Sequence, residues 1–339
     1  MVTTSKSDSR NIEVVSTDDG LHLSGSILWL DSHHIGDLSF LSSPSESYRY
    51  GGPQFLATRE TIRILRMDRK KQSNALVCQY HHPISLGRLK IELLPSGEGL
   101  GSALLHIETG KSKILYAPSL YTQQTSVVPK IHLKKADTLI LRAILPDPSL
   151  PSPNRKKEKQ RLLAKVLFFL ENGVSPTIVC RQTFIAQEVT ALLTSHQISV
   201  ATHPIIYRIS KIYESSGSHL GRFHLFNRKV TKKNKKVQVN IFPLSKDRIF
   251  NRYKPKRPIL LVKDRLGESY DYIDSFVSES NRFHLSSTCH IGELREVMGH
   301  VSPSQVYVFG PYTKRYVQEL KNDAYLVSPL YPNGQPTLL

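Results

Sequence analysis

Apolar and polar residues alternate along the first part of the chain in short runs that are typical of β-strands. Between residue 14 and about residue 143, the runs LHLSGSILWL, ALVCQYH, RLKIELLP, ALLHIE, KILYA and TLILRAIL are separated by turns rich in Gly, Pro and Ser. One helix is expected among them, over residues 59–67. We therefore expect residues 14–150 to be mostly sheet, preceded by a flexible N-terminus at residues 1–13.

A proline-rich segment, PDPSLPSPN at residues 146–154, predicts a boundary, because proline suits neither a helix interior nor a central strand. Beyond it, the pattern predicts a basic amphipathic helix over residues 155–173 that ends with Gly173 at the C′ position, the strand TIVC, a helix over about residues 183–195 and the strand ISVA. This alternation favours a small α/β unit with parallel strands at residues 151–258. The strands ILLVKD and QVYVFG and helices over residues 291–298 and 313–321 indicate that residues 259–339 complete the first unit.

The composition narrows the class of protein. A chain of 339 residues with 39% hydrophobic content can form a packed core. Its three cysteines, Cys78, Cys180 and Cys289, are far apart and odd in number, which favours a reducing compartment over a disulfide framework. The first residues lack the apolar core of a signal peptide, and no apolar run reaches the roughly 18 residues of a membrane span. We expect a soluble, cytoplasmic protein with no membrane association.

The charge points to a polyanionic partner. Lys and Arg number 46 against 28 Asp and Glu, which gives a net charge of +18, so that nucleic acid is the first partner expected. Residues 221–258 concentrate this charge and carry interleaved rings at Phe223, Phe226 and Phe242. The alternative for this segment is a hairpin with a solvated, lysine-rich tip at residues 231–236. The residues predicted to contact phosphates or stack on bases are Lys232, Lys233, Lys235, Lys236, Phe250, Arg252, Tyr253, Lys254, Lys256 and Arg257.

The order of these segments resembles a known family. The stretches GLHLSGSILWLDS, LSFLSSPSESYRY, QFLATRETIRIL, RLKIELLPSGEGLGSALLHIE, KILYAPSLY and ADTLILRAILPDP are similar, in order and spacing, to successive strands of metallo-β-lactamase-fold nucleases. The likeness is greatest to the beta-CASP group and its bacterial ligase-associated exonucleases, also described as mRNA 3′-end-processing factors. FHLSSTCHIGELREVMGHVSPSQVYVFGPYTKRYVQEL resembles the closing segment of that group. The resemblance runs from about Gly20 and implies an αββα sandwich with an inserted beta-CASP-like α/β domain, and two divalent metal ions at one edge of the sandwich.

The same resemblance locates the positions at which that family carries its metal ligands. The His-x-His-x-Asp-His motif falls on SPSESY, so that Ser43, Ser45, Ser47 and Tyr48 replace ligands. A hydroxyl is a poor ligand beside imidazole or carboxylate, and an arginine opposes a cation. We therefore expect no metal and no other cofactor, and no family-type catalysis, although Glu98 could still ligate. The remaining ligand positions fall on Glu98, Ser119, Arg142, Ser287, Thr288 and Gly310.

Two functions follow from this resemblance. The expected one is a catalytically inactive nuclease-like protein, which binds nucleic acid or acts as a scaffold in DNA repair or RNA processing and whose protein partner is an active nuclease or ligase. The alternative is an active hydrolase, an exonuclease or phosphodiesterase, with a rebuilt and metal-poor site in which Glu98, His33 or His34 and the serines converge.

Two further motifs carry weaker signals. Cys78, His81 and His82 have a zinc-type spacing, but no second pair accompanies them at the spacing of a zinc finger, so that a strand end is expected. The glycines of GEGLG are not followed by the Lys-Ser/Thr of a phosphate-binding loop.

Overall fold

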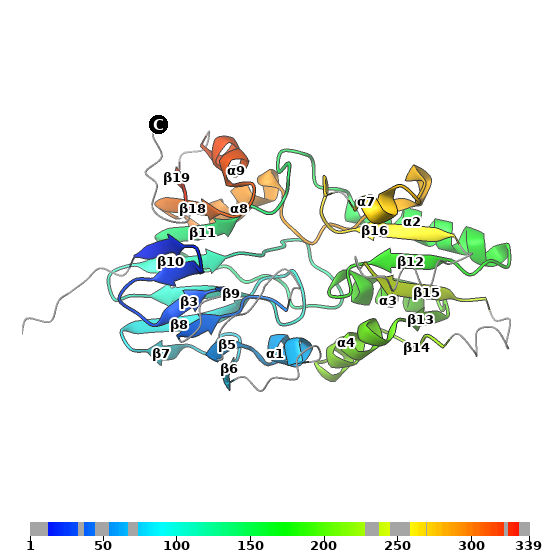
Figure 1. Ribbon diagram of the computed structural model, residues 1–339, viewed down its shortest axis with the longest axis horizontal. Coiled ribbons are helices and arrows are strands. Elements are labelled where there is room, and N and C mark those ends of the chain that lie inside the picture. Colours follow the sequence, from blue (N-terminus) through cyan, green and yellow to red (C-terminus); the bar gives the residue numbers. More distant parts are fainter. Residues whose placement is uncertain are drawn as a thin grey trace, which may run out of the picture.

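The computed structural model describes residues 13–32, 37–44, 54–66, 74–227, 237–244, 258–268, 270–321 and 325–331. Over these residues the chain is a mixed α/β protein with three β-sheets, which form two lobes side by side (Figure 1). The first lobe holds two of the sheets and the second lobe holds the third. The expected mixture of helix and sheet is confirmed. None of the helices in the described part of the chain has the length and apolar character needed to cross a membrane.

The first sheet begins antiparallel and ends parallel. The pairs β1–β2 and β2–β3 are antiparallel, whereas β3–β4, β4–β5 and β5–β6 are parallel. Helix α1 (Arg59–Arg66) packs on its outer face through Ile62, which contacts Phe55 and Ala57. The strands, in sheet order, are β1 (Val14–Thr17), β2 (Gly20–Leu23), β3 (Leu28–Leu30), β4 (Leu38–Phe40), β5 (Gln54–Thr58) and β6 (Asn74–Cys78).

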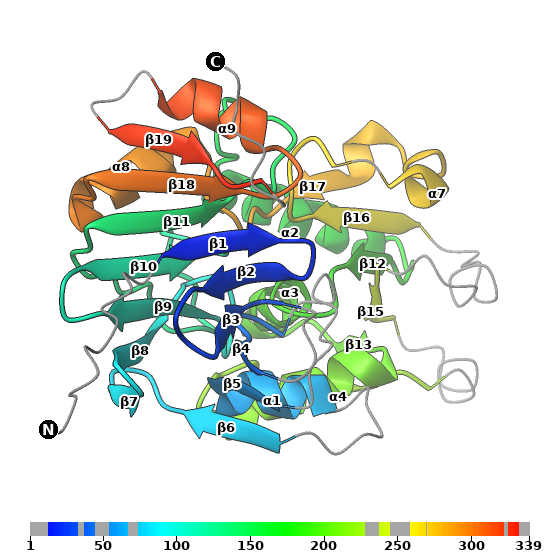
Figure 2. The same ribbon diagram turned by 60° about the vertical axis from the view of Figure 1, so that its left-hand side comes forward.

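The second sheet packs against the first. Their facing sides share one core that includes Phe40 and Leu56 of the first sheet and Leu105 and Tyr116 of the second, and Figure 2 shows the first strands in front of the second sheet. The other side of the second sheet is covered by α8 (Ile291–Val301) and α9 (Thr313–Leu320). The layers of the first lobe are thus α8 and α9, the second sheet, the first sheet and α1. The strands of the second sheet, in order, are β19 (Leu326–Pro329), β18 (Gln305–Phe309), β11 (Thr138–Arg142), β10 (Lys113–Ala117), β9 (Ala103–Glu108), β8 (Leu89–Pro95) and β7 (Ile84–Leu86).

The third sheet is entirely parallel and forms the second lobe. Helices α2 (Arg155–Glu171), α3 (Ile185–Ser195) and α4 (Pro204–Ser215) pack on one face, and the short α7 (Asp271–Asp274) packs on the other. Because its central strands are covered on both faces, they are continuous apolar runs such as TIVC and ILLV. The strands, in order, are β14 (Phe223–Leu225), β13 (Val200–Thr202), β15 (Val239–Pro243), β12 (Thr177–Cys180), β16 (Ile259–Lys263) and β17 (Arg282–His284).

Two sequence predictions about this lobe are wrong. The sheet continues past residue 258 through β16 and β17, because ILLVK pairs with the central strand β12 and not with the first lobe. The alternative hairpin in residues 221–258 is also wrong, since β14 and β15 lie on opposite sides of β13 and both are parallel to it. Helix α4 was not predicted, although HPIIYRISKIY carries a proline in the first turn and apolar residues three or four apart.

Helix α2 leads from the first lobe into the second. Its N-cap is Asn154, whose side chain accepts a hydrogen bond from the backbone of Lys157 at 2.9 Å. The helix ends at Glu171, and Gly173 has a φ of 70°, as expected for a glycine at C′. Most of the predicted flexible N-terminus, residues 1–12, lies outside the described residues.

Candidate functional site at the junction of the two lobes

The two lobes meet where parallel strands of two sheets end. In the second sheet, Ser119 follows β10 and Arg142 ends β11, while in the third sheet Arg181 follows β12 and Asp264 follows β16. The carboxyl ends of parallel strands are common binding sites in α/β proteins. We call the polar residues gathered here the junction site, which consists of Glu98, Ser119, Arg142, Arg181, Asp264, Arg265 and Ser287.

An ion pair between Arg181 and Asp264 lies at the centre of the junction site. Nε of Arg181 is 2.8 Å from Oδ2 of Asp264, and the two side chains are 16% and 1% exposed. Burial by itself would lower the pKa of Arg181, but the carboxylates of Asp264 and Glu98 outweigh it and hold that pKa above its usual value. Ser287 also donates a hydrogen bond to Oδ2 of Asp264 at 3.3 Å. Arg181 is therefore a fixed cation that neutralises a buried carboxylate.

Glu98 is the second carboxyl group of the junction site. It lies in the loop between β8 and β9 and is 6% exposed. Burial raises the pKa of Glu98, and the nearby Arg181, Ser119 and Arg265 offset only part of that rise. Its Oε2 atom and Oδ1 of Asp264 are buried and have no hydrogen-bond partner among the described residues. The site thus holds one carboxyl group that tends to keep its proton.

The glycines around Glu98 serve close packing between the lobes. A Cβ atom on Gly99 would lie 1.8 Å from the ring of Phe184, which belongs to the second lobe. Gly97 has a φ of 77°, and a Cβ there would lie 2.1 Å from the backbone oxygen of Tyr121. The loop is therefore filled on both sides and leaves no room for a phosphate to approach these two glycines.

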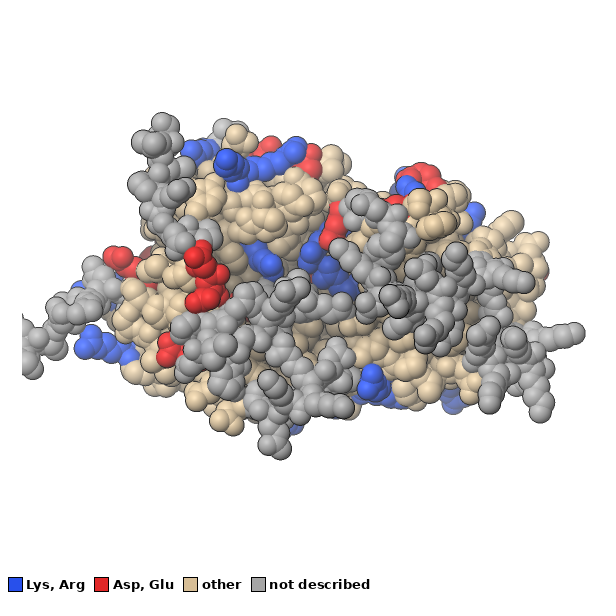
Figure 3. Space-filling view, viewed as in Figure 1, with Lys and Arg blue, Asp and Glu red and all other residues tan. Residues whose placement is uncertain are grey.

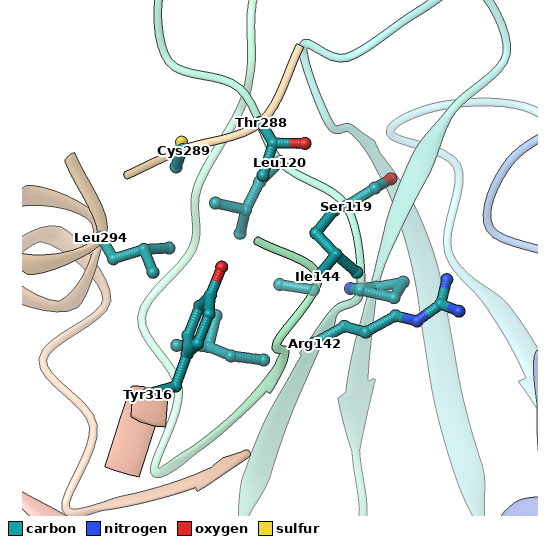
Figure 4. Close-up of a pocket in the computed structure, with 11 residues that line it drawn as sticks. Ser119, Leu120, Arg142, Ile144, Thr288, Cys289, Leu294 and Tyr316 are labelled. Carbon is teal, nitrogen blue, oxygen red and sulfur yellow. The ribbon is translucent and has the colours of Figure 1, made fainter. Parts of the chain in front are cut away.

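Arg142, Ser119 and Thr288 line a small cavity beside the junction site (Figure 4). Its volume is about 10 Å³, which is at the lower limit for a single water molecule. Figure 4 shows the guanidinium group of Arg142 extending away from Cys289 and Tyr316, which line the other side. A substrate or a pair of hydrated ions does not fit into this cavity.

Ser43, at the first of the predicted ligand positions, is buried and does not line an open site. Its hydroxyl accepts a hydrogen bond from the hydroxyl of Ser102 at 3.4 Å, and it is 1% exposed. The neighbouring Ser42 donates its backbone N–H to Asp31, whose carboxylate also accepts from Tyr116. This loop is thus fastened to the second sheet by hydrogen bonds. Ser45, Ser47, Tyr48, His33 and His34 lie outside the described residues.

The last two ligand positions of the resemblance add no metal-binding group. Gly310 has no side chain and adopts a φ of 111°, with the backbone oxygen of Ala143 2.9 Å from its would-be Cβ. Thr288 offers only a hydroxyl, and its backbone N–H is bonded to the hydroxyl of Ser286.

A second buried charge network joins the lobes next to the junction site. Arg155, at the start of α2, donates to both carboxylate oxygens of Glu188 on α3 and to the backbone oxygen of Ser286. The same guanidinium donates to the hydroxyl of Tyr121 in the first lobe at 3.1 Å and lies 5.0 Å from the centre of that ring. Lys159 also contacts Glu188, at 2.6 Å. Arg155 therefore ties α2, α3 and the first lobe together.

The charges of the junction site are suited to holding the lobes together and poorly suited to binding a cation. The carboxyl groups of Glu98 and Asp264 lie near the guanidinium groups of Arg181 and Arg265, while Arg142 acts on the carboxyl group of Asp31. Two dications close together require several anionic ligands, and here Asp264 is already paired with Arg181 while burial favours the protonated form of Glu98. Over the part of the chain that the structure describes, no group of three or more His, Cys, Asp or Glu side chains could hold a metal ion.

All ten residues predicted to contact nucleic acid lie outside the described residues. Of the three other rings of this segment, Phe242 lies in the packed interior of the second lobe, whereas Phe223 and Phe226 are partly exposed. Phe242 is buried, with Phe226 and His203 at ring-centre distances of 5.0 and 5.5 Å, and Phe223 packs at 5.5 Å from Tyr207. Phe242 is therefore not available for stacking on bases.

The Cys78, His81 and His82 motif does not converge. Cys78 is buried at the end of β6, which raises its pKa to about 11, and His82 bonds the backbone oxygen of Tyr80. His81 packs instead on His132, with ring centres 4.8 Å apart, and burial lowers its pKa. The expected strand end is what the structure has at this motif.

Comparisons with known proteins show the fold and no family. No family model matches the sequence, and no curated protein matches it. Among solved structures, the chain is similar to the crystal structure of a protein of unknown function from Enterococcus faecalis V583. The TM-score is 0.60 and the identity 14%, over 87% of this chain and 79% of that one. At this identity the similarity is evidence of a shared fold alone.

The residues that organise the junction were mostly missed at the level of sequence. Arg181, Asp264 and Arg265 follow the apolar runs TIVC and ILLVK directly, and charged residues at the carboxyl end of a buried strand are a usable signal. Arg155 carries no comparable signal, because it begins a helix with many other charged residues, whereas Glu188 is the one charged residue of the otherwise uncharged α3 and could have been noticed. Their pairing depends on how α2 and α3 cross.

Proposed function

We propose that the chain is a catalytically inactive member of the metallo-β-lactamase-fold beta-CASP nuclease group, which acts as a nucleic-acid-binding or scaffold subunit. The layer order of the first lobe supports this proposal, and so does the third sheet, which is inserted between the paired strands β11 and β18. Both features agree with the sequence resemblance, which implies a layered sandwich with a late α/β insertion.

The charge at the junction site is the observation that supports the absence of catalytic activity. The positions that correspond to the family's ligands hold Ser119, Arg142, Ser287 and Thr288, and the buried carboxylate of Asp264 is paired with Arg181. Removing a guanidinium from a buried carboxylate costs several kcal/mol, so that a metal ion would have to displace a strong partner. We infer that ion pairing has taken over the position of the metals.

The proposal that the protein binds nucleic acid is based on its positive charge. The net charge of +18 gives the molecule a field that attracts polyanions, and Figure 3 shows Lys and Arg side chains where the two lobes meet. A subunit of this kind would position a strand for a separate active nuclease or ligase in cytoplasmic DNA repair or RNA processing. The residues 232–257 predicted from the sequence would add to this surface.

The proposal is tested by metal content, cleavage and binding, measured on the same purified protein. We expect substoichiometric zinc and manganese by plasma mass spectrometry, and no cleavage of labelled single- or double-stranded DNA or RNA with Mg²⁺, Mn²⁺ or Zn²⁺. We also expect binding of these strands with an affinity that falls steeply with salt. Two tightly held metal ions together with cleavage would refute the inactive half, and no binding at low salt would refute the nucleic-acid half.

An active hydrolase with a rebuilt site remains the second candidate because of Glu98. Its carboxyl group is buried, its pKa is raised and Oε2 is without a partner among the described residues, which are properties of a general acid. This candidate predicts metal-independent hydrolysis of bis(p-nitrophenyl) phosphate that Glu98→Gln abolishes. Equal turnover by the wild-type protein and Glu98→Gln would exclude it.

A further inference from the structure

A row of cations runs along the solvent face of α2. Lys157, Arg161 and Lys165 are four residues apart, so that they lie on one side of the helix at intervals of about 6 Å. The row starts two residues beyond Arg155, which is buried at the junction of the lobes, and ends at the exposed ring of Phe168. A strand that leaves the junction along α2 would therefore pass three cations and then an aromatic ring.

The cations differ in how they are held. Arg161 is paired with Glu158 at 2.6 Å, and its guanidinium lies 5.2 Å from the ring centre of Phe283. Nζ of Lys165 lies 5.7 Å and 5.5 Å from the ring centres of Phe168 and Phe169. Over the described ranges, no carboxylate lies within ion-pair distance of Lys157 or Lys165, so that both can accept a phosphate without breaking an ion pair.

Beside the row lies a groove of about 380 Å³. This volume falls within the range of small-molecule sites, about 300–1,000 Å³. Its walls are apolar and aromatic and its rim is basic. Phe168 is 55% exposed, so that its ring is accessible to a base that enters the groove. The residues that line the groove are Arg161, Ala164, Lys165, Phe168, Ser280 and Phe283.

We propose that this face of α2 binds single-stranded nucleic acid, with phosphates on Lys157 and Lys165 and one base stacked on Phe168. The inference rests on the proposed nucleic-acid-binding function and assigns it a surface outside residues 232–257. A single strand fits better than a duplex, because a side-chain ring can stack only on a base that is not already paired within a helix. Exposed cations in excess of carboxylates also favour nucleic acid over a protein partner.

The test compares a normal strand with one that has no bases. Fluorescence anisotropy with fluorescein-labelled oligothymidine and with an abasic strand of equal length separates stacking from charge. Phe168→Ala should weaken binding of oligothymidine about tenfold and leave the abasic strand unaffected. Lys157→Gln combined with Lys165→Gln should weaken both strands and reduce the slope of log affinity against log salt by about 1.4, since each phosphate contact on a single strand contributes about 0.7.

Matched controls lie on other exposed sites of the same chain. Phe276→Ala removes a ring that is 72% exposed, and Lys314→Gln with Lys321→Gln removes one exposed cation in α9 and one at its C-cap. Neither change should alter the affinity by more than about twofold. If Phe168→Ala weakens binding of oligothymidine and of the abasic strand equally, the assignment of a stacked base to Phe168 is overturned. Displacement of oligothymidine by polyglutamate as readily as by unlabelled oligothymidine would show a surface for acidic protein. Unchanged affinity in all α2 variants overturns the inference alone, whereas a wild-type protein that binds no strand overturns the proposed function as well.

Discussion

Substitution of Arg181 by methionine should destabilise the protein strongly. Arg181 neutralises Asp264, which is 1% exposed, and its removal leaves that carboxylate buried beside Glu98 without its guanidinium partner. Breaking one side of a buried ion pair costs about 3–5 kcal/mol. Whole-domain stabilities are about 5–15 kcal/mol, so this loss is a large fraction of the total.

Urea denaturation followed by circular dichroism measures this loss directly. In thermal melts of the same variants, a Tm shift of about 2 °C per kcal/mol means that Arg181→Met should lower the Tm by about 6–10 °C. The double variant Arg181→Met with Asp264→Leu should recover most of the stability, because two apolar side chains can replace a buried pair at little cost. The control is Lys211→Met, which removes an exposed pair with Glu214 and should cost at most about 0.5 kcal/mol.

The reasoning fails if Arg181→Met costs no more than Lys211→Met. It also fails if the double variant is as unstable as the single one, since the loss would then come from packing of the arginine chain and not from an uncompensated carboxylate. Either result would remove the argument that ion pairing occupies the junction.

Three further predictions concern stability. The pKa of Glu98 is raised in the folded state above its value of about 4.5 in the unfolded state, so the folded protein binds this proton more tightly. Stability is therefore lost as the pH rises from about 4.5 through the folded pKa. Glu98→Gln should therefore stabilise by about 1 kcal/mol at pH 7 and by less at pH 4 in thermal melts, and an equal effect at both pH values would contradict the assignment. Gly99→Ala should cost about 1–3 kcal/mol of stability, because the added methyl group collides with Phe184. The control Gly292→Ala lies in a helix with open space around it and should be neutral or stabilising. Equal urea midpoints for the two variants would refute the packing role of Gly99. Asn154→Ala should cost about 1 kcal/mol by loss of the α2 N-cap, and Asn154→Asp should retain the urea midpoint.

The sequence predicts the elements of this fold better than their partners. The length of apolar runs such as TIVC and KILYA predicts strands, and the spacing of apolar residues predicts helices. Helices α1, α2 and α8 begin within a residue or so of the expected positions. The extent of the third sheet was not predictable in the same way. Whether ILLVK joins one sheet or another depends on contacts with β12, about eighty residues earlier, and nothing in its own composition records that choice.

At the candidate site, too, the positions of residues along the chain were easier to predict than their partners. Ser119, Arg142 and Ser287, which the resemblance assigns to ligand positions of one metal site, lie at the junction of the lobes. The pairing of Arg181 with Asp264 was not visible, since it requires knowing that β12 and β16 are neighbours. The burial of Ser43 was also missed, because a short serine-rich stretch is equally compatible with an exposed active-site loop and with a buried loop whose hydroxyls bond the backbone.

The insertion of the second lobe has a consequence for synthesis of the chain. Asp137 and Ser304, which are hydrogen-bonded beside the paired strands β11 and β18, are 167 residues apart. A ribosome therefore releases the whole parallel sheet of the second lobe before β18 can close the sheet of the first. Such distant pairing is slow, and an unpaired strand edge is prone to aggregation. A nascent chain that ends before Gln305 should hold a folded second lobe next to a first lobe that is still open along β11, and the cell must shield that edge until translation is nearly complete.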